Sequence, residues 1–297
     1  MRITKKTLKL LLLTAISGVI MGFISKFFLD FLTLSSEFRD KHPYILIILP
    51  ITGMLTAFVY KNYGEGSQRG NNLIIDSVHK NSHVPLRMSF FTFIFTILTH
   101  LSGGSAGREG TAVQIGGTIT NKLAESFRLD INYKKILIMS GISAGFGSVF
   151  GTPLAGTFFG VEMCFMGKLS YESFIPCFTA SYVADFVAKS IGAVHSSHSI
   201  VFVPQITPYI FAVVVLAACI FGVVGKYFSI FIHFFKNSYT KLFKNYLIRA
   251  FVSSVFIIAV MIVFNWTKYE GLSTWMMNEG FEGKTTLYDP LAKYILT

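Results

Sequence analysis

The feature that most constrains this chain is a succession of apolar stretches separated by glycine-rich breaks. A helix needs about 20 apolar residues to span a bilayer. The segments at 109–125 and 153–166 are shorter and begin after glycine or proline, and broken helices are tolerated at membrane depth only where protein or water covers their backbone. This pattern is typical of a transporter or channel. Apolar stretches fall near 8–34, 44–60, 86–101, 109–125, 135–150, 153–166, 171–191, 208–235, 246–266 and, weakly, 271–278.

Composition agrees with a membrane location. Of the 297 residues 52% are hydrophobic and 14% are charged, whereas soluble domains carry about 25% charged residues. We therefore expect an all-α protein that crosses the cell membrane several times. The run from Leu8 to Phe28 follows the basic start MRITKKTLK and is too long for a signal peptide. It is expected to be a retained first helix with a cytoplasmic N-terminus.

Neither the charge nor the cysteines predict another class of protein. The net charge of +11 comes from scattered residues, which favours lipid headgroups and cytoplasmic loops over nucleic acid. Cys164, Cys177 and Cys219 lie in apolar segments without metal-ligand spacing, and we interpret them as packing residues. The sequence predicts no metal, no cofactor and no enzyme.

An internal repeat predicts two related halves. The motif G-x-x-x-K-F-F-x-x-F begins at Gly22, and G-x-x-x-K-Y-F-x-x-F begins at Gly222, an offset of 222 − 22 = 200 residues. Residues 1–192 would form a first transmembrane repeat and 193–297 an incomplete second one. The counterpart of 103–111 would fall at 303–311, so the sequence is expected to be a truncated version of a longer transporter. By itself it is expected not to transport anions.

The break SGGSAGREGTAVQIGG, residues 102–117, carries the strongest functional signal. Its glycines allow a sharp turn before a helix whose first N–H groups lack internal partners. Those N–H groups and the positive end of the helix dipole attract an anion. The carboxylate of Glu109 can occupy that place and leave it on protonation, so a proton and an external anion would compete. An ionisable residue at membrane depth is a functional candidate by default, whereas Arg108 is expected to pair with a carbonyl or with Glu109.

Two further breaks leave alternatives open. In GEGSQRGNNLII, residues 64–75, Asn71 and Asn72 are either helix N-caps or donors to an anion. The segment from Gly141 to Met163 is rich in small residues, which favours close helix packing.

Taken together, these residues resemble the CLC family of chloride channels and anion/proton antiporters. GREGTAVQIGG (107–117) is similar to the family's GREGP-x-VQIGG, and FGTPLAGTFFGVEM (150–163) to its F-x-x-P-L-A-G segment. The resemblance implies an inverted-repeat bundle of tilted and broken helices. It also implies a homodimer in which each subunit has its own pore. Glu109 would be the gating glutamate that couples protons, and the anion would lie among Asn71, Asn72, Arg108, Gly110 and Thr111.

Three departures narrow this expectation. Gly70-Asn71-Asn72-Leu73-Ile74 replaces the GSGIP of chloride-selective members, and Met163 stands where proton-coupled chloride antiporters carry a second glutamate. Both are similar to the bacterial fluoride/proton antiporter branch. The family's G-x-F-x-P segment and late tyrosine would follow residue 297.

The predicted function is therefore anion transport, as fluoride/proton antiport across the lipid bilayer. The alternative within the family is a chloride channel or a chloride/proton exchanger. Two alternatives from other classes are an intramembrane enzyme that uses His100, Ser102 and Glu109, and a remnant that does not transport.

Overall fold

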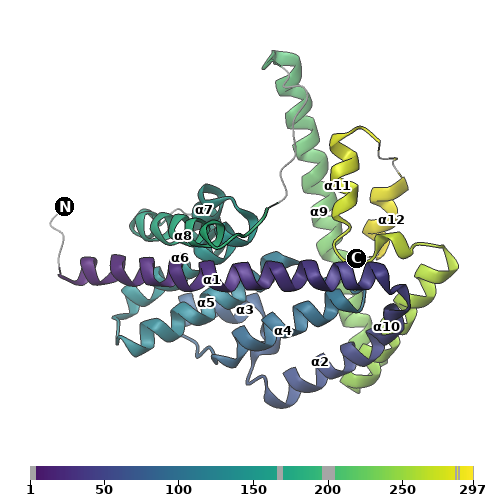
Figure 1. The fold of residues 1–297 in the computed structure, drawn as a ribbon, viewed down its shortest axis with the longest axis horizontal. Coiled ribbons are helices and arrows are strands. Elements are labelled where there is room, and N and C mark those ends of the chain that lie inside the picture. The colour runs from purple at the N-terminus through teal and green to yellow at the C-terminus, as the bar shows by residue number, and fades with distance from the viewer. Residues whose placement is uncertain (1–4, 166–169, 196–204, 285, 287, 297) are drawn as a thin grey trace.

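All regular structure in the described part of the chain is helical. The computed structural model describes residues 5–165, 170–195, 205–284, 286 and 288–296, and these contain no strand (Figure 1). This confirms the all-α prediction. The helices of the first part are α1 (Lys5–Lys41), α2 (Leu49–Tyr63), α3 (Asn71–Lys80), α4 (Arg87–Leu101), α5 (Arg108–Ser126), α6 (Ile131–Phe150), α7 (Pro153–Met163) and α8 (Tyr171–Ser190). Those that follow are α9 (Pro208–Leu242), α10 (Tyr246–Val263), α11 (Thr274–Phe281) and α12 (Tyr288–Leu296). Short 3-10 helices cover Pro43–Ile48, Ser67–Arg69 and Thr267–Tyr269.

Helix α6 lies at the centre of the bundle. It packs against α1, α5, α7 and α8, and α1 also crosses α4 and α8. The largest apolar cluster joins α3, α5, α6, α7 and α8 through fully buried side chains such as Ile74, Val113 and Ile142. A second packing unit pairs α2 with α10. The core therefore holds α3 and α5, the two helices that follow the glycine-rich breaks at 64–70 and 102–107.

Small residues let these helices approach closely, as the segment from Gly141 predicts. A Cβ on Gly116 of α5 would lie 2.1 Å from the carbonyl oxygen of Gly141 in α6. A Cβ on Gly22 of α1 would lie 2.7 Å from the carbonyl oxygen of Ala184 in α8. Any side chain at these positions would force two backbones apart.

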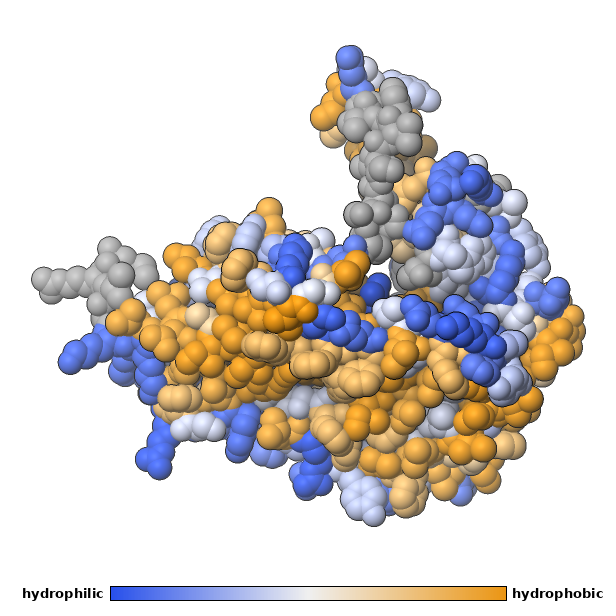
Figure 2. All heavy atoms as spheres, viewed as in Figure 1, coloured by the Kyte–Doolittle hydropathy of each residue, from blue (hydrophilic) through white to orange (hydrophobic). Residues whose placement is uncertain are grey.

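Among the described residues, four stretches are long and apolar enough to cross a membrane: α1, the stretch Pro43–Tyr63, α9 and α10. Hydrophobic side chains cover much of the face that Figure 2 shows. At 1.5 Å per residue the 37 residues of α1 extend about 55 Å, nearly twice the roughly 30 Å hydrocarbon core. A helix of that length fits by tilting or by extending beyond the bilayer.

The structure agrees with the two short segments that the sequence predicts and adds one helix. Helix α7 has 11 residues, and α5 has 19 residues, about 28 Å, one residue beyond each end of the predicted 109–125. Helix α12 was not predicted, because Asp289 and Pro290 interrupt the apolar run there.

One end of α9 projects beyond the bundle (Figure 1), whereas Phe228 farther along the helix contacts Tyr294 of α12. None of its described residues is buried, so the interpretation of Cys219 as a packing residue is wrong, whereas Cys164 and Cys177 are buried as predicted. The two copies of the repeated motif lie on α1 and α9, which have 37 and 35 residues. The division into two halves remains a prediction.

Candidate functional site

Helix α3 begins at Asn71, with Gly70 as its N-cap. Gly70 has φ +58° and ψ −135°, a conformation that costs a residue with a side chain far more than it costs glycine. Asn71 is therefore the first helical residue, and its side chain makes no capping hydrogen bond to α3. The interpretation of the asparagines as caps is wrong, and the side chain of Asn71 is available for another role.

Helix α5 begins at Arg108, directly after Gly107 in extended conformation. Glu109 lies in its first turn, and the carboxylate turns back over Gly107, so that a Cβ on Gly107 would lie 2.6 Å from Glu109 Oε2. The side chain of Glu109 is exposed in the described structure. The carboxylate thus lies at the positive end of the α5 dipole, with space into which it can move.

The neighbours of Glu109 make contacts of different kinds. Arg108 is half-buried, and its guanidinium lies over the ring of Phe150 at 5.5 Å. This cation–π contact was not predicted, and the charge of Glu109 also attracts the guanidinium, as expected. Thr111 is buried, and its hydroxyl lies 2.9 Å from that of Thr96 on α4. Thr111 can therefore offer an anion its backbone N–H but not an uncommitted hydroxyl.

The starts of α3 and α5 meet through Asn71 and Gly110. A Cβ on Gly110 would lie 3.5 Å from Asn71 Nδ2 and 3.7 Å from Gln114 Nε2, which are ordinary contact distances, so both amide side chains lie directly against Gly110. Gln114 Nε2 donates to Asn71 Oδ1 at 3.0 Å. Asn72, the other candidate from the same break, is exposed. The fold therefore brings Asn71, Gly110 and the first turn of α5 together and leaves Asn72 outside the contact.

Three polar residues in this contact were missed by the sequence analysis. Gln114 accepts from Thr92 Oγ1 at 2.8 Å, and the Thr92 hydroxyl lies 3.2 Å from that of Tyr60. For Gln114 a signal existed, because it follows Gly110 by four residues and so lies on the same face of α5. Tyr60 and Thr92 lie on separate helices within apolar stretches, where nothing local distinguishes them.

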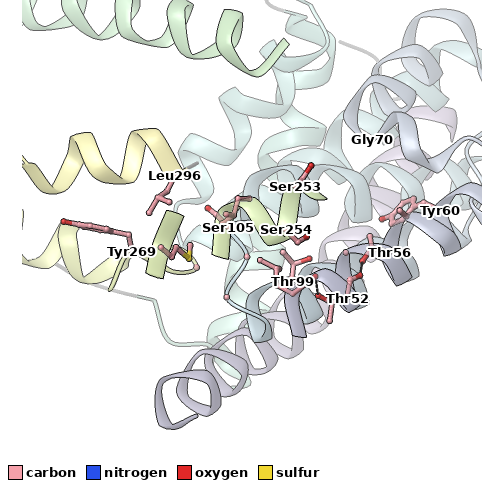
Figure 3. A pocket seen from close by; sticks show the side chains of 18 of the residues that line it. Thr52, Thr56, Tyr60, Gly70, Thr99, Ser105, Ser253, Ser254, Tyr269 and Leu296 are labelled. Carbon is pink, nitrogen blue, oxygen red and sulfur yellow. Dashed lines mark hydrogen bonds between the residues drawn. The ribbon is translucent and has the colours of Figure 1, made fainter. Parts of the chain in front are cut away.

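A cavity of about 590 Å³ adjoins the two helix starts. Gly70 and Gln114 form part of its wall, and the loop from Gly103 to Ser105 forms another part. Figure 3 shows side chains from α2, α4 and α10 around this space. The cavity wall includes the hydroxyl groups of Thr52, Thr56, Tyr60, Thr99, Ser253 and Ser254. The serine and threonine hydroxyls among them donate to backbone carbonyls of their own helices, so they offer the cavity acceptor oxygens.

The loop before α5 is held by residues from the far end of the chain. Gly271 donates its backbone N–H to Gly103 O at 3.2 Å. Glu270 lies beside Gly103 and 3.7 Å from Arg39 Nε, and both side chains of this ion pair are 10% exposed. Burial raises the pKa of Glu270, and Arg39 partly opposes this effect. Lys293 donates to Tyr269 O and Gly271 O, at 3.0 and 2.7 Å.

The geometry gives no support to the enzymatic alternative. Ser102 Oγ donates to Leu98 O and lies 2.9 Å from Thr52 Oγ1. His100 Nε2 is buried and has no hydrogen-bond partner among the described residues. A base that contacts no nucleophile lacks the arrangement that nucleophilic catalysis requires.

Known proteins match most of this chain. The family profile described as voltage gated chloride channel matches residues 52–297. A "Chloride/fluoride channel protein" from Pseudomonas syringae pv. tomato is 36% identical over 296 residues, 97% of this chain and 66% of the relative. An "H(+)/Cl(-) exchange transporter" of Vibrio parahaemolyticus is 30% identical over 152 residues, 48% of this chain and 31% of the relative. The chain therefore spans slightly less than two thirds of the first relative and about a third of the second.

Solved structures agree with the sequence matches. A "CLC-type fluoride/proton antiporter" superposes with a TM-score of 0.93 at 34% identity, over 99% of this chain and 75% of that one. A cyanobacterial Cl⁻/H⁺ antiporter shares the fold, with a TM-score of 0.77 at 16% identity. The profile match, the Pseudomonas relative and the shared fold lead to one assignment: this multi-pass membrane protein belongs to the voltage-gated chloride channel, or CLC, family.

Proposed function

We propose that the function in which this chain takes part is the transport of anions across the cell membrane, with fluoride exchanged for protons. The observation that carries the proposal is the meeting of two helix N-termini, where the Asn71 carboxamide lies against Gly110 in the turn that holds Glu109. Backbone N–H groups and the Asn71 amide supply donors for a small anion that is a strong hydrogen-bond acceptor. The names of the Pseudomonas relative and of the fluoride/proton antiporter support fluoride as the substrate.

In the proposed mechanism Glu109 is the gating residue. Its carboxylate rests over Gly107 at the start of α5 and competes with an anion for the same N–H groups. Protonation removes the negative charge of Glu109 and with it the attraction to the helix dipole. The anion then takes the place that the carboxylate leaves, and Glu109 carries the proton. Asn71, Gly110 and the backbone of Thr111 would contact the anion, and the Arg108 charge would attract it. The side chain of Asn72 is exposed and would not contact the anion. Asn72 would contribute only as part of the N-terminus of α3.

The proposal also covers assembly and organisation. We infer a homodimer with one pore in each subunit, and two transmembrane repeats at 1–192 and 193–297. A chloride channel or a chloride/proton exchanger remains the rival function. The replacement of the family serine by Asn71 and of the second glutamate by Met163 favours fluoride exchange over this rival.

The test is efflux of fluoride and chloride from liposomes that contain the full-length protein. Ion-selective electrodes follow both anions at neutral pH while a trapped dye reports internal pH. Fluoride efflux coupled to proton entry, with slower chloride efflux, is the expected result. Faster chloride efflux would establish the rival function, and efflux equal to that of protein-free liposomes would refute anion transport.

A further inference from the structure

A chain of hydrogen bonds connects the start of α3 to two other helices. Asn71 on α3 is joined to Gln114 on α5, Gln114 to Thr92 on α4, and Thr92 to Tyr60 on α2. The three contacts measure 3.0, 2.8 and 3.2 Å. We propose that Gln114 is a positioning residue, which with Thr92 and Tyr60 orients the Asn71 carboxamide so that its N–H groups face the anion.

The direction of the chain follows from its donors and acceptors. The single hydroxyl hydrogen of Thr92 is donated to Gln114 Oε1, so Tyr60 donates to Thr92. Gln114 then presents its Nε2 to Asn71 and occupies Oδ1. Because Oδ1 is occupied, Asn71 turns its Nδ2 away from Gln114.

The Asn71 carboxamide lies against the first turn of α5, where a Cβ on Gly110 would be 3.5 Å from Nδ2 and 3.7 Å from Oδ1. Gln114 occupies Oδ1, and Nδ2 donates to no other residue in the part of the chain that the structure describes. The N–H groups of that turn lack intrahelical partners. An anion at this place would meet backbone donors from α5 and the carboxamide donors of Asn71 together.

Orientation matters because a carboxamide has two unlike ends. If Asn71 rotated by half a turn, it would present a carbonyl oxygen, which repels an anion, in place of two N–H donors. Fluoride accepts hydrogen bonds more strongly than chloride, so fixing the donor end favours fluoride. Gln114 would thus set anion preference without contacting the anion itself.

This inference rests on the proposed function, and its test uses the same liposomes. The variants Gln114→Met and Thr92→Val each break the chain, with nearly constant side-chain volume. The matched control is Thr118→Val on α5, because the buried hydroxyl of Thr118 has no hydrogen-bond partner among the described residues. Each substitution is also placed in an Asn71→Ser background, where there is no carboxamide to orient.

We expect Gln114→Met and Thr92→Val to lower the fluoride-to-chloride flux ratio about fivefold, the effect of one hydrogen bond of about 1 kcal/mol. Thr118→Val should leave the ratio unchanged. In the Asn71→Ser background neither Gln114→Met nor Thr92→Val should lower it further, because the non-additivity of a double-mutant cycle reports coupling.

Two results would overturn the inference. One is an unchanged ratio in both chain-breaking variants, and the other is an equal fall in the presence and absence of Asn71. Size-exclusion chromatography identifies a misfolded variant, and if Gln114→Met fails to fold, Thr92→Val decides alone. A wild-type protein that moves neither anion refutes the proposed function instead, so the two failures are distinguishable.

Discussion

The crossing of α5 and α6 makes the sharpest stability prediction. A Cβ on Gly116 would lie 2.1 Å from the Gly141 carbonyl oxygen, whereas ordinary contacts begin at 3.4 Å. Gly116→Ala must therefore separate two backbones by 3.4 − 2.1 = 1.3 Å. Overpacking a core, with the side-chain and backbone shifts that it forces, costs about 1–3 kcal/mol. Since a backbone must move here, we expect a loss of about 3 kcal/mol in the free energy of unfolding.

Substitutions at two other glycines serve as comparisons for the loss in free energy of unfolding expected for Gly116→Ala. A Cβ on Gly117 would lie 2.6 Å from Ile74 Cγ2, which is part of a side chain and can yield, so Gly117→Ala should cost about 1 kcal/mol. A Cβ on Gly222 of α9 would meet nothing within 4 Å. Gly222→Ala should be neutral or stabilising by up to about 1 kcal/mol, because alanine has the higher helix propensity.

The assay is denaturant unfolding of the purified variants in detergent, followed by circular dichroism. The expected order of stability is Gly222→Ala above Gly117→Ala above Gly116→Ala. If Gly116→Ala is as stable as Gly222→Ala, the close contact between α5 and α6 does not exist in solution. Because α5 also carries Glu109 and Gln114, the same separation should reduce anion flux in Gly116→Ala.

Three further predictions concern charge and selectivity. Glu109→Gln should abolish proton movement while anion flux persists or changes, as simultaneous pH and electrode recordings will show; undiminished coupling would exclude the gating role. Asn71→Ser should shift the fluoride-to-chloride preference at least several-fold and Asn72→Ser should not, because only Asn71 lies against Gly110; equal shifts would contradict this difference. Burial raises the pKa of Glu270 above its usual 4.5, so the folded protein binds its proton more tightly than the unfolded chain does. Stability should then fall as pH rises from about 4.5 through the raised pKa, and unfolding curves of Glu270→Gln should lack this loss; an identical pH profile would show that another group is responsible.

Much of the architecture was predictable because its causes are local. Apolar runs gave most helices to within a few residues, and glycine marked the starts of α3 and α5. Backbone N–H groups at a helix start lack partners in any fold, so Glu109 was a candidate without a structure. The apolar pattern missed α12, because Asp289 and Pro290 interrupt the apolar run there.

The arrangement of the candidate site was decided by tertiary structure. Asn71 and Gln114 are 43 residues apart, and their hydrogen bond depends on how α3 and α5 are rotated about their axes. Packing sets those rotations, through contacts such as that of Gly116 with Gly141. The sequence by itself determined that helices begin at these glycine-rich breaks and that a carboxylate lies at one of them. Successive residues on a helix point in directions about 100° apart, so Asn71 and Asn72 cannot both face that turn. Only the packing of α3 against α5 decided that Asn71 faces it and Asn72 faces away.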